Sequence, residues 1–345
     1  MKAVVIEQQG SVDNLVYRDW PDPELRAGDV IVAVKAVGMN HLDIFVRRGM
    51  PGFPVKMPFI SGGDISGFIV DKAPDVTGWN IGDRVALNPM TPEGMIGEQV
   101  QGGMAERVRV PATRLVRIPE GLDYVTAAAV PINFGTSLRM LETIAKVRRD
   151  ELVLIYGASG GVGTASIQLS QHMGARVIAV TRGQGKAAAL REKLALDHVI
   201  DSEVTDVSAE AWKISGKKGV DVVINSTGGD TWVPSLRAMG KRARLITCGA
   251  TAGFDPKTDI RYIWKRELQV LGSNGYTQND IERSFELVGS GKMRPLVSHV
   301  LDATEARRAH LILEDREVIG KVVVTFNEGL NPGRRAASAD ESVNP

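Results

Sequence analysis

A glycine-rich turn near the middle of the chain constrains its fold more than any other feature. Residues 157–163 read GASGGVG, the apolar run 152–156 (LVLIY) precedes them, and apolar residues at helical spacing follow as far as Gly174. A strand, a glycine turn and a helix in this order bind dinucleotides, because the glycines let the backbone approach a pyrophosphate and the helix N-terminus attracts it. The alternative is a glycine turn with a purely structural role. The residues expected to contact the pyrophosphate are Ser159, Gly160, Gly161, Val162 and Gly163.

The patterns on either side of this turn predict two domains, as expected for a chain of 345 residues. Short strand-like runs broken by Gly, Pro and Asp come first. Later runs such as 177–180 (VIAV) and 220–224 (VDVVI) alternate with helical stretches, which is typical of α/β proteins with a doubly wound parallel sheet. We expect a β-rich domain over residues 1–127 and 277–326, a Rossmann-type nucleotide-binding domain over 128–276, and a flexible tail over 327–345.

The composition excludes several classes of partner. Hydrophobic residues make up 43% of the chain and charged residues 24%, values typical of soluble proteins. The net charge of +1 gives no electrostatic reason for a nucleic-acid or membrane partner. The single cysteine, Cys248, excludes an intrachain disulfide and a thiolate-rich zinc site. The first residues, MKAVVIE, contain too short an apolar stretch for a signal peptide. We expect a cytoplasmic protein that acts on a small molecule.

The chain resembles the medium-chain dehydrogenase/reductase superfamily from Met1 to about Phe326. Five segments carry the resemblance: the glycine turn, 40–43 (NHLD), 102–106 (GGMAE), 118–122 (IPEGL) and 320–323 (GKVV). The nearest branches are the quinone oxidoreductases and the crotonyl-CoA-reductase-like members, and zinc-binding alcohol dehydrogenases are relatives. The resemblance implies that a GroES-like catalytic domain and a Rossmann domain meet where cofactor and substrate bind. It also implies a homodimer joined by edge strands at residues 268–271, unless the chain's own helices cover that edge.

The positions that bind zinc in such relatives have lost their ligands here. The metal is held there by a Cys, a His and a Cys or Asp, and the matching positions are Asn40, Gly63 and Asn133. Glycine has no side chain, and an amide oxygen is a poor zinc ligand. The four-cysteine structural zinc lobe is replaced by the cysteine-free stretch 88–103. We therefore expect no zinc, which excludes alkoxide stabilisation by a metal. Residues 90–98 either shape the substrate entrance or pack the shortened loop.

The residues after the run 177–180 predict NADP(H) as the cofactor. NAD enzymes place a carboxylate on the ribose 2′-hydroxyl about 20 residues beyond the glycine turn, but residues 181–186 read TRGQGK. A carboxylate facing a 2′-phosphate at about 4 Å would cost roughly 1 to 4 kcal/mol. We expect Arg182 on the 2′-phosphate, with Thr181 beside it and Lys186 assisting. The alternative is that these cations only form a solvated face.

The resemblance implies the remaining cofactor contacts. Lys321 is expected to pair with a phosphate. His41 is expected to touch the pyrophosphate or, equally, to be a hydrogen-bonded structural histidine. Nicotinamide neighbours and residues along the ribose and pyrophosphate path are expected to be Thr136, Ser273, Asn274, Asn225, Gly249 and Ala250.

Without a metal, the substrate must already be electrophilic, as in quinones and in C=C bonds conjugated to a carbonyl or thioester. Positioning and hydrogen bonds to the developing enolate or quinol oxygen then drive the reaction. We expect Asn40 to donate to that oxygen, Asp43 to orient Asn40 or another group of the pocket, and Asn133 to complete the catalytic set. The alternative for Asp43 is helix capping or an ion pair with Arg47 or Arg48.

The predicted activity is zinc-independent, NADPH-dependent reduction of quinones or α,β-unsaturated carbonyl and enoyl compounds by hydride transfer. Because no Ser, Lys or Tyr relay stands out, the proton is expected from water or a ribose hydroxyl. Two alternatives stay open: a metal-free alcohol or carbonyl dehydrogenase of the same superfamily, and a non-catalytic NADPH-binding protein.

Overall fold

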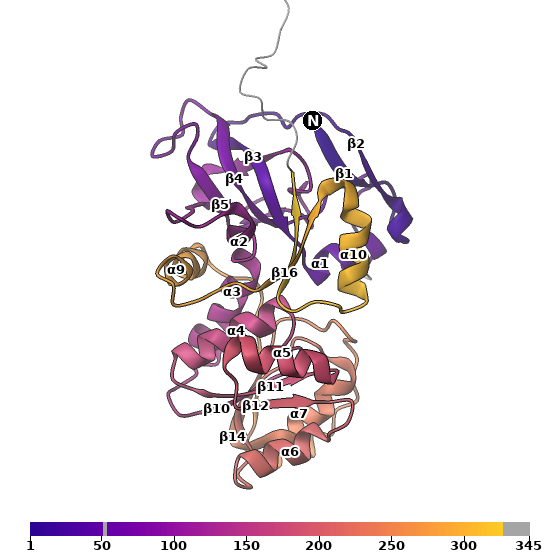
Figure 1. Cartoon of the computed structure of the whole chain (residues 1–345), viewed down its shortest axis with the longest axis vertical. Helices are drawn as coiled ribbons and strands as arrows, with labels where there is room; N and C mark the ends of the chain where they lie inside the picture. Colours follow the sequence, from indigo (N-terminus) through magenta and orange to yellow (C-terminus); the bar gives the residue numbers. More distant parts are fainter. Residues whose placement is uncertain (51–53, 327–345) are drawn as a thin grey trace, which may run out of the picture.

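The computed structural model describes residues 1–50 and 54–326, so the tail predicted over 327–345 lies outside the described residues. Two lobes lie one above the other, and each is built around its own sheet (Figure 1). The first and last strands share the upper lobe, and the middle of the chain forms the lower one. Within the described segments, no helix combines the length and apolar character needed to cross a bilayer.

The upper lobe contains a mainly antiparallel sheet of order β16-β17-β3-β4-β5-β9, in which β8 also pairs with β3. Strand β17 pairs antiparallel with β3, so the end of the chain completes a sheet that begins near its start. The strands of this lobe are β1 (Lys2–Ile6), β2 (Leu15–Asp19), β3 (Asp29–Gly38), β4 (Asp64–Lys72), β5 (Arg84–Leu87), β6 (Met90–Thr91), β7 (Gly94–Met95), β8 (Arg107–Pro111), β9 (Leu115–Arg117), β16 (Val297–Asp302) and β17 (Lys321–Thr325).

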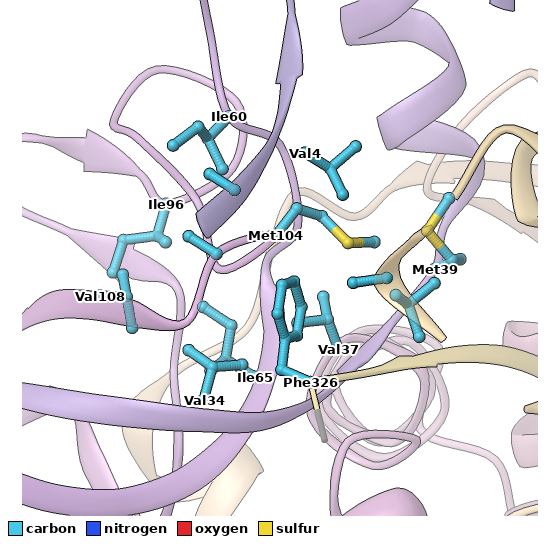
Figure 2. Packing of buried hydrophobic residues seen from close by; sticks show 14 of the residues in the cluster. Val4, Val34, Val37, Met39, Ile60, Ile65, Ile96, Met104, Val108 and Phe326 are labelled. Atoms are coloured by element: carbon cyan, nitrogen blue, oxygen red, sulfur yellow. The ribbon is translucent and has the colours of Figure 1, made fainter. Parts of the chain in front are cut away.

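The core of this lobe combines both ends of the chain. Val, Ile and Met side chains alternate toward the interior because strand residues point to opposite faces in turn. Figure 2 shows Phe326, which follows β17, among buried residues from the N-terminal part of the chain such as Val37 and Met104. Burial of apolar surface contributes about 25 cal/mol per Å², so these contacts hold β17 in the upper lobe.

The lower lobe is a six-stranded, fully parallel sheet of order β12-β11-β10-β13-β14-β15. Apolar clusters on both of its faces confirm the predicted doubly wound α/β fold. The strand order reverses at β10, and ligands of such sheets bind beside the carboxyl ends of the strands at this point. Its elements are β10 (Leu152–Ile155), β11 (Arg176–Thr181), β12 (His198–Asp201), β13 (Val220–Ile224), β14 (Met239–Thr247), β15 (Gln269–Gly272), α4 (Gly161–His172), α5 (Gln184–Leu194), α6 (Val207–Ile214), α7 (Trp232–Ala238) and α8 (Arg261–Arg266).

Helix α3 (Pro131–Leu138) joins the two lobes and contacts both α4 and α9 (Gln278–Gly289). Residues Ile281 and Phe285 of α9 lie in the same apolar cluster as the β10 strand, although we expected residues 277–326 to return to the first domain. The position of the domain boundary therefore stays a prediction. The remaining helices are α1 (His41–Arg48), α2 (Tyr124–Ala127), α10 (Ala306–Glu314), the π-helix η3 (Arg139–Ile144) and the 3-10 turns η1 (Val12–Asn14), η2 (Ala112–Arg114), η4 (Gly229–Thr231) and η5 (Ala303–Glu305).

Candidate functional site

The glycine turn connects β10 to α4, in the strand–turn–helix order that the sequence predicts. Gly157 adopts a φ of 63°, which favours glycine. A Cβ atom on Gly163 would lie 2.2 Å from the carbonyl oxygen of Gly157, so only glycine lets the helix approach the turn this closely. Gly160 precedes the first turn of α4, whose free N–H groups form an anion-binding end. The local geometry suits a pyrophosphate.

The segment between α10 and β17 brings the upper lobe to this turn. The backbone N–H of Gly320 donates to the carbonyl oxygen of Ser159 at 2.8 Å. Lys321, the next residue, begins β17. The end of the chain therefore lies directly beside the glycine turn.

A buried ion pair lies at the junction of the two lobes. The ammonium nitrogen of Lys321 is 2.6 Å from a carboxylate oxygen of Asp64. The same nitrogen is 2.6 Å from Asn40 Oδ1 and 3.2 Å from Asn133 Oδ1. The side chains of Lys321 and Asp64 are 2% and 0% exposed. Since an ammonium has three N–H donors, each has an oxygen acceptor. We call these four residues the lysine cluster.

The other bonds of the lysine cluster fix its geometry. The second carboxylate oxygen of Asp64 accepts the N–H of Ile132 at 2.7 Å. The amide nitrogen of Asn40 donates to Asp64 at 3.0 Å and to the carbonyl oxygen of Gly38 at 3.3 Å. Both N–H groups of Asn40 are therefore engaged, and donation to a substrate oxygen, which stays a prediction, requires one of these bonds to be exchanged.

Asp43 holds the backbone around Asn40. Its carboxylate accepts the N–H of Asn40 and the N–H of Gly62, both at 2.8 Å. Burial raises the pKa of Asp43 to about 6, although these hydrogen bonds and the charge of Lys321 act in the opposite direction. This geometry is that of the helix-capping alternative.

Arg47 and Arg48, offered above as partners of Asp43, both pair with Glu314 of α10 instead. The Arg47 side chain is buried. This ion pair therefore attaches α1 to α10 within the upper lobe.

The donor set at the positions matching zinc ligands does not fit zinc. Asn40 and Asn133 offer amide oxygens that already accept from the Lys321 ammonium. A Cβ atom on Gly63 would lie 3.0 Å from the carbonyl oxygen of Ile96, so a histidine there would require backbone movement. Across residues 1–50 and 54–326, no group of three or more His, Cys, Asp and Glu side chains could hold a metal ion.

Asn133 links the lysine cluster to the glycine turn. A Cβ atom on Gly161 would lie 2.4 Å from the amide nitrogen of Asn133, so this amide lies against the first turn of α4. A charge or ligand at the glycine turn can therefore act on the lysine cluster through one side chain.

Cations from both lobes approach the end of β11. Thr181 is buried, Arg182 is exposed, and the Lys186 ammonium donates to the carbonyl oxygen of Arg316. Burial, followed by the charge of Arg316, lowers the pKa of both Lys186 and His41. Sequence reasoning missed Arg316, because its role depends on the return of the segment before β17 to this place.

Two carboxylates were also missed: Asp201, the last residue of the neighbouring strand β12, and Glu203, which follows it. Asp201 accepts the N–H of Gly183 at 2.9 Å. The charge of Glu203 raises the pKa of Lys186, although burial and Arg316 outweigh it. Only the pairing of β11 with β12 brings these acids beside residues 181–186. The choice between NADP(H) and NAD(H) therefore stays a prediction.

Asn225 lies at the end of β13 and is completely buried. Its amide nitrogen donates to Thr231 and Ser235, and its oxygen accepts the N–H groups of Thr227 and Gly228. Its bonds in this structure therefore shape the turn at residues 225–231.

The turn after β14 lies against that segment. The N–H of Thr251 donates to the carbonyl oxygen of Ser226 at 3.2 Å, and that of Ala252 donates to Thr227 at 2.7 Å. Gly249 and Ala250 begin this second turn, beside the carboxyl ends of the strands.

The expected nicotinamide neighbours come from α3 and from the end of β15. Thr136 is buried on α3. Ser273 is also buried, and its hydroxyl has no hydrogen-bond partner in the described part of the chain, whereas Asn274 is exposed. Sequence reasoning missed Tyr276, which is 8% exposed and whose hydroxyl likewise lacks a partner among the described residues. The one available signal was its position three residues after Ser273.

Comparison with known families matches both lobes. Residues 26–120 match the alcohol dehydrogenase GroES-like domain, and residues 161–290 match the zinc-binding dehydrogenase family. Acryloyl-coenzyme A reductase of Sulfurisphaera tokodaii is 29% identical over 346 residues, which cover 94% of this chain and 99% of that protein.

Solved structures show the same likeness. An NAD-dependent alcohol dehydrogenase is 32% identical with a TM-score of 0.89, covering 95% of this chain and 100% of that one. The 2-octenoyl-CoA carboxylase reductase CinF, in complex with NADP and 2-octenoyl-CoA, is 26% identical with a TM-score of 0.85, covering 96% of this chain and 89% of that one. The chain therefore belongs to the medium-chain dehydrogenase/reductase superfamily and is an NAD(P)-dependent oxidoreductase.

Proposed function

We propose that this protein reduces a C=C bond conjugated to a carbonyl or CoA thioester, using NADPH and no zinc. Its similarity to an acryloyl-CoA reductase and to a 2-octenoyl-CoA carboxylase reductase supports this substrate class. In such compounds the carbonyl withdraws electrons from the β-carbon. That carbon therefore accepts hydride without help from a metal.

The lysine cluster is the observation that carries the proposal. An ammonium and three oxygen acceptors lie among the residues that match zinc ligands in related dehydrogenases. A second cation would be repelled there, and the available amide oxygens are poor zinc ligands. Alkoxide chemistry, which depends on a Lewis acid, is thereby disfavoured relative to reduction of an activated double bond.

The distribution of charge supports NADPH. Arg182 follows β11 directly, the charges of Lys186 and Arg316 approach from the two lobes, and Glu203 and Glu317 oppose them. NADPH, when bound, supplies the hydride. The chain would hold the pyrophosphate at the glycine turn, with His41 beside it, and orient the nicotinamide between Thr136 and Ser273. Lys321, expected from the sequence to pair with a phosphate, has all three N–H donors engaged in the lysine cluster and is not free to do so in this structure. Such positioning contributes up to about 7–11 kcal/mol in favourable cases.

Steady-state assays of NADPH oxidation test the proposal. The acceptors are acryloyl-CoA, a simple enone, p-benzoquinone and a ketone, each assayed with NADPH and with NADH, before and after chelation. We expect turnover of the conjugated acceptors, at least about tenfold higher kcat/KM with NADPH than with NADH, equivalent to about 1.4 kcal/mol, and no effect of the chelator.

Three results would contradict this assignment. Turnover of the ketone alone would identify a carbonyl dehydrogenase, the alternative favoured by the NAD-dependent alcohol dehydrogenase relative. Binding of NADPH without turnover of any acceptor would indicate a non-catalytic protein. A stoichiometric metal whose removal abolishes turnover would disprove zinc independence.

A further inference from the structure

We propose that the hydroxyl of Tyr276 donates the proton that completes the reduction, at the α-carbon of the substrate. This inference rests on the proposed function and adds to it a catalytic residue on the loop after β15. Hydride transfer alone leaves an enolate, so a proton donor must lie close to the substrate.

The first observation is an unsatisfied buried hydroxyl. Tyr276 is 8% exposed, and its oxygen makes no hydrogen bond to any residue that the structure describes. Buried polar groups in native proteins are nearly always hydrogen-bonded, and an unsatisfied one costs about 1–3 kcal/mol. A ligand that accepts from this hydroxyl would remove that cost.

The second observation places Tyr276 beside the expected nicotinamide site. A Cβ atom on Gly135 would lie 3.1 Å from Cγ of Tyr276, so the phenol ring packs against α3 at Gly135. The next residue of α3 is Thr136. Ser273, at the end of β15, has a second buried hydroxyl without a partner among residues 1–50 and 54–326. Two unsatisfied hydroxyls thus occur within four residues of chain, on the loop that follows β15.

The third observation places the loop that carries Tyr276 beside the expected substrate entrance. A Cβ atom on Gly275 would lie 3.5 Å from the terminal methyl of Met90, which begins the segment 90–98. Burial, and then the charges of Asp64 and Glu98, hold the pKa of Tyr276 well above its ordinary value. Both carboxylates are therefore near the ring. Tyr276 lies between residues expected at the cofactor and residues expected at the substrate.

The chemistry balances with water as the final proton source. Hydride adds to the β-carbon, the C=C π bond breaks, and the electron pair moves onto the carbonyl to give an enolate. The O–H bond of Tyr276 then breaks as a C–H bond forms at the α-carbon. The resulting phenolate takes a proton from water. A tyrosine phenol is protonated at neutral pH, and the enolate is the stronger base, so the proton moves to the substrate once the enolate forms.

The variant Tyr276→Phe tests this role. Since the hydroxyl has no partner in the described structure, its removal should leave the melting temperature unchanged or slightly raised. Loss of a general acid typically costs roughly 10²–10⁴-fold in rate. We therefore expect kcat with acryloyl-CoA and NADPH to fall at least about 100-fold, with an unchanged Kd for NADPH.

A quinone separates a catalytic role from a structural one. Reduction of p-benzoquinone places protons on oxygen, which exchanges protons with solvent without an enzymatic donor. The Tyr276→Phe variant should therefore keep its rate with p-benzoquinone within about twofold of the wild type. The matched control is Tyr156→Phe, which alters another buried tyrosine, in the apolar cluster on one face of the parallel sheet, and should leave both rates unchanged.

Each opposite result has a distinct meaning. A wild-type protein that reduces acryloyl-CoA, together with a Tyr276→Phe variant that does so equally well, overturns the role of Tyr276 alone. Equal losses with acryloyl-CoA and p-benzoquinone also overturn it, because they indicate displaced cofactor or substrate. A wild-type protein that reduces no conjugated C=C bond overturns the proposed function, and the proton-donor role with it.

Discussion

Within the lysine cluster, Lys321 is expected to contribute strongly to the free energy of unfolding. Lys321 is the cationic partner of the buried Asp64 carboxylate, and removing one partner of a buried ion pair typically costs about 3–5 kcal/mol. We expect Lys321→Met to lower the free energy of unfolding by that amount, measured by urea denaturation. A matched control is Lys2→Met, which breaks an exposed pair with Asp19 and should cost less than about 1 kcal/mol.

The double variant Lys321→Met/Asp64→Asn makes the test specific. Because it removes both charges, it should recover part of the stability lost in Lys321→Met. Equal small losses in Lys321→Met and Lys2→Met would show that the buried pair does not stabilise the fold.

At this scale, sequence reasoning identified residue types but not their partners. The poor fit of Asn40, Gly63 and Asn133 to zinc could be predicted, because glycine has no side chain and amide oxygens are poor zinc ligands. The bond between Lys321 and Asn40 spans 281 sequence positions and follows only from the pairing of β17 with β3. Tyr276 and Arg316 were missed for a similar reason, since burial and distant neighbours give them their roles.

At the scale of elements, the junction of the glycine turn and α4 is the most constrained. A Cβ atom on Gly163 would collide with the backbone of Gly157 at 2.2 Å, and backbone cannot yield as a flexible side chain does. Gly163→Ala should therefore lower the melting temperature and weaken NADPH binding at least about tenfold, measured by fluorescence titration. Overpacking of this kind typically costs about 1–3 kcal/mol.

Gly185 provides the matched control. It lies in α5, and a Cβ atom there would meet no described atom within 4 Å. Gly185→Ala should leave NADPH binding unchanged and stabilise the helix by up to about 1 kcal/mol. If Gly163→Ala bound NADPH as tightly as Gly185→Ala, close approach at the turn would be unimportant for the cofactor.

Elements defined by local patterns were predicted well. The run 220–224 coincides with β13, and the helix expected after the glycine turn is α4. The role of α9 was harder to predict, since its apolar face would suit either lobe. Its contact with α3 could not be predicted, because no local pattern reports on such a contact.

At the scale of the whole molecule, we predict a homodimer. Strand β15 is an edge of the parallel sheet, with β14 as its neighbour in the described structure, and its Val270 is 43% exposed. Two further large apolar residues are exposed, Ile260 just before α8 and Trp264 on it. An uncovered edge of this kind favours pairing with a second copy. Light scattering after size exclusion should report a dimer, and Val270→Asp should shift it to monomer.

The matched control is Val204→Asp, which makes the same change of residue away from β15. Val204 is exposed in the loop after β12, so this variant should remain a dimer. A wild-type monomer, or a Val270→Asp variant that remains dimeric, would exclude the β15 edge as the interface.

The buried ammonium of Lys321 also has an evolutionary consequence. A lineage that replaced Gly63 with histidine, or Asn40 with cysteine, would gain no metal while that positive charge stays in place. A lineage that lost the lysine first would leave a carboxylate stranded in the interior and a less stable protein. Single substitutions of these two kinds are therefore expected to give either no metal binding or a less stable protein.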